Sequence, residues 1–132
     1  MILSASEFVR LRTSDDPDEY RRAASDEASE DVWIEIIENY SDMKIWVAAN
    51  KTVPLSVLSR LSDDPDPEVR FAVASKRKLD QSLFEKLARD KDESVRQRIA
   101  YNKKTPLEIL ELLAVDSEEM VSSVAKERLQ AD

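Results

Sequence analysis

One repeating unit recurs along most of this chain, and its period constrains the fold more than any other feature of the sequence. Residues 95–116 (VRQRIAYNKKTPLEILELLAVD) fall into register with residues 69–90 (VRFAVASKRKLDQSLFEKLARD), so the period is the separation of Val69 from Val95. A period of this length is typical of stacked helical repeats, in which each unit packs against its neighbours. The matched positions are Val69 and Val95, Val73 and Ile99, Ala74 and Ala100, Leu83 and Ile109, Leu87 and Leu113, and Asp90 and Asp116.

The apolar spacing within each copy predicts two helical pieces. In the last full copy, Ile109 and Leu113 share one face of the second piece, and we expect Thr105 to cap it with Pro106 at the first helical position. Asp80 is the expected cap in the preceding copy. Because neither piece can bury its apolar stripe alone, we predict an all-α fold, an α-solenoid of stacked two-helix repeats.

The ends of the first helical pieces need an explanation, because helices commonly end on a left-handed glycine and this chain has none. Asn50 and Asn102 stand where the first piece must stop, and asparagine is the next-best residue for that conformation. We therefore expect both residues to be left-handed. Lys76 takes the equivalent place in the middle copy, where we expect strain or a different turn.

We predict a single domain over residues 1–132, built in three parts. Residues 1–42 are degenerate acidic repeats in which Ser4 and Glu7 form a capping box and Trp33 lies in the core. Residues 43–119 are three regular repeats. Residues 120–132 form a C-terminal capping half-repeat, with Met120 at the first core position, one residue early.

The composition narrows the possible chemistry, because the chain has no cysteine, no histidine and no glycine. The commonest structural metal ligands and the usual neutral-pH acid–base residue are therefore missing, and standard phosphate-cradling loops cannot form. No nucleophile–base arrangement is visible, so we predict no enzyme activity, no metal and no cofactor. Without a membrane-length apolar run or a basic leader, we expect a cytoplasmic monomer with no membrane contact.

The net charge of −8 is concentrated at one end of the chain. Residues 1–42 contain 12 Asp and Glu against 4 Arg, whereas acidic and basic side chains are equal in number over residues 43–132. Such asymmetry favours a cationic partner, although a solvated surface that aids solubility is the simpler interpretation.

Two arginines, Arg70 and Arg96, follow a core valine and should be partly buried. A buried guanidinium needs a carboxylate, and the recurring Asp64, Asp90 and Asp116 are the candidates. We predict an internal Arg–Asp ladder that ties the repeats together, in preference to a substrate-binding role.

The turn that leaves each first helical piece is basic. Compensation of the helix dipoles explains these charges most simply. Stacking would also align the turns into a stripe that could follow a phosphate backbone. The candidate phosphate-binding residues are Lys76, Arg77, Lys78, Lys103 and Lys104.

Three large apolar residues, Ile45, Trp46 and Phe71, lie off the predicted core face. Cover by the N-terminal helices is the simpler interpretation. The alternative is an exposed patch that anchors a protein partner, with Trp46 as its main residue.

The repeat resembles the variant leucine-rich repeat family, a relative in shape of HEAT-repeat solenoids. The resemblance covers residues 43–129 well and residues 4–42 loosely. It implies a right-handed all-helical superhelix with 3₁₀ character in the shorter helices. An iron–sulfur cluster known in that family sits on N-terminal cysteines, which this chain lacks. The motifs that carry the resemblance are Val-Arg at 69–70 and 95–96, Ala-x-Asn at 48–50 and 100–102, Thr-x-Pro at 52–54, Thr-Pro at 105–106, paired aliphatics and a closing aspartate.

Two hypotheses of different class follow. The first is a non-catalytic scaffold that binds another protein on a solenoid face, with the acidic first third docking a basic partner as an immunity protein docks a toxin. The second is nucleic-acid binding along the basic turns, which the overall acidity makes the weaker hypothesis. HEAT-like DNA glycosylases resemble the chain in architecture only, since no catalytic carboxylate in an aromatic cleft is identifiable.

Overall fold

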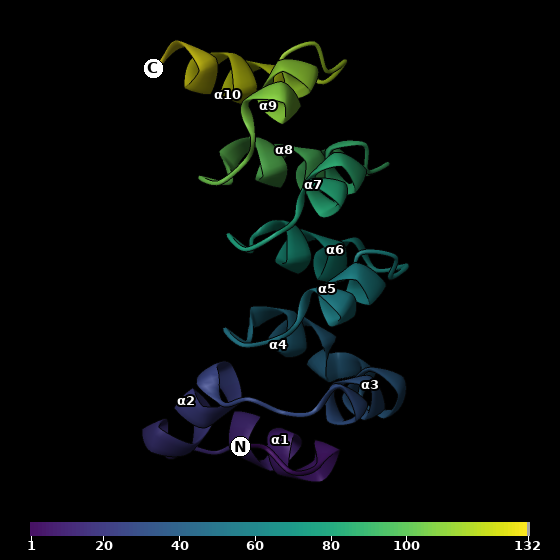
Figure 1. Ribbon diagram of the computed structural model, residues 1–132, viewed down its shortest axis with the longest axis vertical. Coiled ribbons are helices and arrows are strands. Elements are labelled where there is room, and N and C mark those ends of the chain that lie inside the picture. Colours follow the sequence, from purple (N-terminus) through teal and green to yellow (C-terminus); the bar gives the residue numbers. More distant parts are fainter. Residues whose placement is uncertain (132) are drawn as a thin grey trace. The chain divides into compact units, whose positions relative to one another are not determined.

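The computed structural model describes residues 1–131, and over this range the chain is all-helical (Figure 1). No β-strand occurs in these residues, and their only β-type pairing is an isolated bridge between Ile2 and Ala28. The predicted all-α fold class is therefore confirmed. The elements are α1 (Ala5–Arg12), α2 (Pro17–Ser25), α3 (Glu30–Asn39), the 3₁₀ helix η1 (Ser41–Met43), α4 (Lys44–Ala49), α5 (Leu55–Leu61), α6 (Pro67–Ala74), α7 (Gln81–Ala88), α8 (Glu93–Tyr101), α9 (Leu107–Leu113) and α10 (Glu119–Gln130).

The chain divides into two compact units, an N-terminal unit (Met1–Leu61) and a C-terminal unit (Ser62–Asp132). In the C-terminal unit, α8 packs against both α6 and α10, and α7 packs against α9 (Figure 1). The first and second helices of successive repeats thus form two layers within this unit. In the N-terminal unit, α3 contacts α1, α4 and α5, while α2 packs against α1 and α4.

The core of the C-terminal unit consists of the apolar positions that recur with the repeat period. Val73, Leu87 and Ile99 are fully buried and Leu113 nearly so, as the period predicts. Each such side chain removes apolar surface from water at about 25 cal/mol per Å², which offsets the entropy lost on ordering the chain.

The core of the N-terminal unit is built around an aromatic pair. Phe8 and Trp33 are both fully buried, and their rings meet edge to face with centroids 5.6 Å apart. This arrangement places the positive edge of one ring against the negative face of the other. Trp33 is therefore a core residue, as predicted.

Side-chain caps start most of the helices. The Ser4 hydroxyl accepts the N–H of Glu7 at the start of α1, but the Glu7 carboxylate accepts the N–H of Leu3 instead of that of Ser4, so only half of the predicted capping box forms. The Asp80 carboxylate accepts the N–H of Leu83 at the start of α7, as predicted. The caps of α2, α6 and α8 are Asp16, Asp66 and Asp92, with Pro17 and Pro67 in the first turn of α2 and α6.

Two sequence predictions about the last repeats are wrong. Thr105 does not cap α9: its buried hydroxyl donates a hydrogen bond of 2.6 Å to the carbonyl of Ile99, and Pro106 occupies the cap position. Met120 is not a core residue, because it is 41% exposed while Val121 is fully buried. Val121 follows Val95 by one full repeat period, so the last copy starts in register. Val124 and Ala125 are nevertheless buried as the early register predicts, while Lys126, one period after buried Ala100, is exposed.

The predicted left-handed asparagines are also wrong, since no residue of the described range has a positive φ. Asn50 and Asn102 both have φ −63°, with ψ 134° and 124°, so the chain leaves the helix in an extended conformation. At Lys76 the helix ends differently, because Ser75 stays near the helical region at φ −80° and ψ −9°. The side chains of the asparagines account for their placement, as described below.

None of the helices described between residues 1 and 131 combines the length and the apolar character that crossing a membrane requires.

Truncation of a core leucine should destabilise the C-terminal unit more than truncation of a surface leucine. Leu87→Ala leaves a cavity and should lower the free energy of unfolding by about 2–5 kcal/mol, measured by urea denaturation with circular dichroism. Leu107, which is 58% exposed, provides the control, because Leu107→Ala removes little buried surface. Equal losses in the two variants would contradict the assignment of the core.

Candidate functional site

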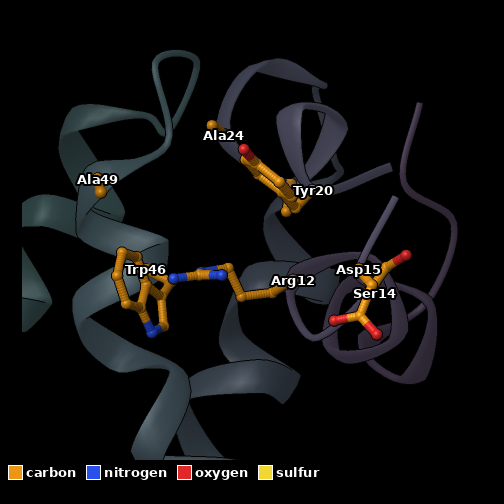
Figure 2. Close-up of a pocket in the computed structure, with 8 residues that line it drawn as sticks. Arg12, Ser14, Asp15, Tyr20, Ala24, Trp46 and Ala49 are labelled. Atoms are coloured by element: carbon orange, nitrogen blue, oxygen red, sulfur yellow. The ribbon is translucent and has the colours of Figure 1, made fainter. Parts of the chain in front are cut away.

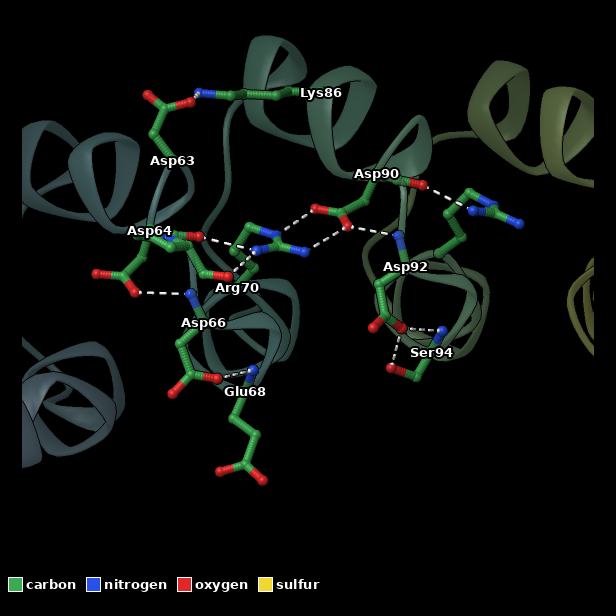
Figure 3. A network of polar contacts seen from close by, with 11 residues as sticks. Asp63, Asp64, Asp66, Glu68, Arg70, Lys86, Asp90, Asp92 and Ser94 are labelled. Carbon is green, nitrogen blue, oxygen red and sulfur yellow. Dashed lines mark hydrogen bonds and ion pairs between the residues drawn. The ribbon is translucent and has the colours of Figure 1, made fainter.

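The predicted Arg–Asp pairs of the C-terminal unit meet as bidentate ion pairs (Figure 3). The Arg70 Nε and Nη2 donate to the two carboxylate oxygens of Asp90, at 2.8 and 3.1 Å. Arg96 makes the same two bonds to Asp116, at 2.9 and 3.3 Å. The Arg70–Asp90 pair is almost dry, with side chains 6% and 7% exposed.

Backbone carbonyls complete the ladder. The Nη1 of Arg70 donates to the carbonyl oxygen of Asp64 at 2.8 Å, and the Nη1 of Arg96 donates to that of Asp90 at 2.7 Å (Figure 3). Asp90 therefore receives one arginine on its side chain and the next on its backbone. Asp64, predicted as a carboxylate partner, serves Arg70 through its carbonyl. Because these buried groups already make their hydrogen bonds inside the protein, few of their donors and acceptors remain for a ligand, and we assign them a structural role.

The ion pairs shift the titration of their members. The hydrogen bond that Arg70 donates to Asp90 raises the pKa of Arg70 above its usual value, and the bond that Arg96 donates to Asp116 does the same for the pKa of Arg96. Burial acts to raise the pKa of Asp116, but the bond from Arg96, the N–H of Glu118 and the charge of Arg96 together hold that pKa below the usual 3.8.

A second set of ties, missed from the sequence, joins successive repeats through buried asparagine side chains. The Nδ2 of Asn102 donates to the carbonyls of Ala74 and Lys76 at 2.9 and 2.7 Å, and its Oδ1 accepts the N–H of Lys104 at 2.9 Å. Asn50, in the turn after α4, makes the same kind of tie in the N-terminal unit. Its Nδ2 donates to the carbonyls of Ala23 on α2 and of Asp26, the C-cap of α2, at 2.8 and 3.1 Å.

Arg128 continues the asparagine pattern in the last repeat. It lies one repeat period after Asn102, and its Nη1 donates to the carbonyls of Ala100 and Asn102 at 2.7 and 2.6 Å. The signal that could have revealed this role is the repeat period itself, applied to polar positions as it was to apolar ones.

The basic turns of the C-terminal unit lie next to each other. The bond from Asn102 to the Lys76 carbonyl joins the turn after α8 to the turn after α6, and Arg98 reinforces it by donating to the Ser75 hydroxyl at 3.0 Å. Lys76 is half-buried, and this burial lowers its pKa. The other candidate phosphate ligands are exposed: Arg77, Lys78, Lys103 and Lys104.

The three off-core apolar residues do not share one element or one unit. Phe71, 41% exposed, belongs to α6 of the C-terminal unit, whereas Ile45 and Trp46 lie on α4 of the N-terminal unit. Ile45 is half-buried, and Trp46 is 40% exposed. The guanidinium carbon of Arg12, on α1, lies 3.5 Å from the centroid of the Trp46 ring, so the indole is partly covered (Figure 2).

A groove of about 570 Å³ opens beside this Arg12–Trp46 pair in the N-terminal unit (Figure 2). This volume is within the range of small-ligand sites. The sequence reasoning did not identify the groove, because α1, α2 and α4 each contribute to it and no single segment carries a motif. Its lining consists of Arg12, Ser14, Asp15, Tyr20, Ala23, Ala24, Trp46 and Ala49.

The comparisons with known proteins do not assign the site. Neither protein families nor curated proteins nor solved structures gave a match to this chain. Within residues 1–131, no group of three or more carboxylates is arranged to hold a metal ion.

Loss of one ladder arginine should cost stability in a pH-dependent way. Arg96→Met leaves Asp116 buried without its cation and should lower the free energy of unfolding by about 3–5 kcal/mol at pH 7. Because the folded pKa of Asp116 is lowered, its contribution is present above pH 3.8 and is lost as the pH falls through the folded pKa. The gap between wild type and variant, measured by urea denaturation from pH 7 down to about pH 3, should therefore narrow below about pH 4.

Arg89 provides the matched control, since it is exposed and forms no ion pair in the described part of the chain. Arg89→Met should change stability little at any pH in this range. A constant gap for Arg96→Met across the titration would mean that its cost comes from lost packing and not from the ion pair.

Proposed function

We propose that the protein is a non-catalytic scaffold, an α-solenoid of two-helix repeats like those of the variant leucine-rich repeat family, that binds a basic protein through its acidic first third, residues 1–42. The solenoid interpretation is supported by the two helix layers of the C-terminal unit and by polar ties that recur between its repeats. Handedness and curvature are part of the proposal and follow from the family resemblance.

The observation that supports the binding proposal is that, in residues 1–42, the arginines are engaged within the chain while several carboxylates are unpaired. All four arginines are engaged: Arg10 with Glu19, Arg21 with Asp18, Arg22 with Asp26, and Arg12 with Trp46. Seven exposed carboxylates of the same segment form no ion pair with any residue of the described range, and these are Asp15, Asp16, Glu27, Glu30, Asp31, Glu35 and Asp42.

Unpaired carboxylates that lie in one segment create a negative potential, which attracts a cationic surface and speeds its association. The engaged acidic groups add little to this field: hydrogen bonds from Arg10 and Arg22 lower the pKa of Glu19 and Asp26, but each ion pair is close to neutral as a whole. A partner with clustered lysines or arginines is the chemistry that complements this surface.

Capture of the partner should depend on salt and on these carboxylates. Immobilised full-length protein should retain a host protein at about 0.1 M salt and lose it at about 1 M, where the Debye length falls to about 3 Å. The triple variant Asp31→Asn, Glu35→Gln, Asp42→Asn should retain much less at low salt, as measured by quantitative mass spectrometry.

A charge-matched variant of the C-terminal unit serves as the control for that capture. Glu108, Glu111 and Glu127 are exposed, and their change to glutamine should leave capture intact. Retention that does not change with salt concentration, or equal losses in both triple variants, would refute binding through residues 1–42.

A second candidate function is binding of a nucleic-acid backbone along the basic turns of the C-terminal unit. The observation that favours it is the bond from Asn102 to the Lys76 carbonyl, which holds the two turns side by side. Adjacent cations can follow successive phosphates, and their contribution weakens as salt rises.

A gel-shift series tests this second function. If it is correct, the variant with Lys76, Arg77, Lys78, Lys103 and Lys104 changed to alanine should bind single- or double-stranded nucleic acid at least about tenfold more weakly than wild type. The exposed pair Arg89→Ala and Lys91→Ala should keep wild-type affinity. No binding by the wild type, or no loss in the five-residue variant, excludes the function.

A further inference from the structure

The groove between α1, α2 and α4 is suited to a specific cation, and we propose that it receives an arginine side chain of the basic partner. This proposal rests on the proposed function and specifies its recognition chemistry. The groove supplies two features that a guanidinium requires, a flat aromatic surface and an unpaired carboxylate.

The aromatic surface comes from the two large exposed rings of the groove. Tyr20 on α2 is 44% exposed and Trp46 on α4 is 40% exposed, and both line the same cavity (Figure 2). The alanines of α2 and α4 that complete the lining are small and leave room for a long side chain. An arginine stem can then lie along apolar surface while its planar head stacks on a ring.

The protein already places one guanidinium in this groove. Arg12 reaches from α1 and stacks on the Trp46 ring at 3.5 Å (Figure 2). Within the described residues Arg12 forms no ion pair, in contrast to the other three arginines of residues 1–42. Stacking of this kind at an exposed ring is weak, so an incoming guanidinium can replace Arg12 on Trp46 or stack beside it on Tyr20.

The lining of the groove has one cation, Arg12, which already stacks on Trp46, and one carboxylate, Asp15, which is available to an incoming cation. Asp15 is exposed, lines the groove and has no ion-pair partner between residues 1 and 131. Figure 2 shows Arg12 extending between Trp46 and the turn that carries Ser14 and Asp15. A second guanidinium would give Asp15 its missing counter-ion. An anionic ligand would instead meet the carboxylate-rich surface of the whole segment.

The side-chain N–H signals of the two tryptophans provide the readout in a nitrogen–proton NMR spectrum of the full chain. Trp46 reports on the groove, and fully buried Trp33 reports on the fold. A capped peptide with one arginine between glycines should shift the Trp46 signal saturably and leave the Trp33 signal in place. The same peptide with citrulline, which is nearly isosteric but uncharged, should bind several-fold more weakly, because the cation–π and ion-pair contributions are lost.

Three variants separate the possible modes of binding. Asp15→Asn should weaken the arginine peptide about two- to fivefold, and Trp46→Leu about fivefold or more, followed at the backbone amides of Ala23 and Ala24. Arg12→Gln should tighten binding, because it uncovers the indole and removes a like charge. Glu108→Gln, which removes an exposed carboxylate of the C-terminal unit that does not line the groove, should leave the affinity unchanged.

The sign of the Arg12→Gln effect decides the proposal. Loss of arginine-peptide binding in that variant would mean that Arg12 helps to form the site instead of competing for it, and this would overturn the proposal. A stronger Trp46 shift with the glutamate version of the peptide would make the groove an anion site and would also overturn it. Absence of any Trp46 shift, with capture by the full chain still sensitive to salt and to the Asp31, Glu35 and Asp42 changes, would overturn the groove proposal alone. Failure of capture as well would overturn the proposed function.

Discussion

Burial of the apolar side chains that recur with the repeat period is the interaction on which the helices of this protein depend. The α-helices range from 6 residues in α4 to 12 residues in α10. Isolated helices shorter than about 12–15 residues are marginal in water. Each helix is therefore stable only because its neighbours cover its apolar side, and Val73, Leu87 and Ile99 are fully buried for this reason.

Apolar burial is not directional, so it does not by itself fix how one helix slides along the next. The polar ties supply that direction. The Arg–Asp pairs join residues 20 positions apart, and the Asn102 bonds join residues 26 and 28 positions apart. A slip of one residue would leave a buried guanidinium or amide without partners, at a cost of several kcal/mol. The ladder therefore selects the register, whatever its net contribution to stability.

The sequence alone predicted the helical fold, the core and the Arg–Asp pairs, because these follow from periodicity and from the need of a buried charge for a counter-ion. The prediction failed for polar residues whose side chain can bond either to its own turn or to a neighbouring segment. Asn102 was interpreted by its local turn preference, yet its amide serves carbonyls of the preceding repeat. Thr105 was interpreted as a cap, yet its hydroxyl bonds to Ile99 behind it. The groove was not predictable, since Arg12, Tyr20 and Trp46 come from three helices whose packing the sequence does not specify.

The positions that repeat between copies differ in their structural role from the positions that do not repeat. Repeating residues are committed to the fold: their apolar members are buried, and their charged members are bonded inside the C-terminal unit. Trp46 is different, because the residues one and two repeat periods later are Ala72 and Arg98. An exposed tryptophan that no repeat requires contributes little to stability, and it lies in the unit that contains the acidic residues 1–42. The partner recognition that we propose is therefore placed where the repeat is broken, in the N-terminal unit around Trp46, Tyr20 and Asp15.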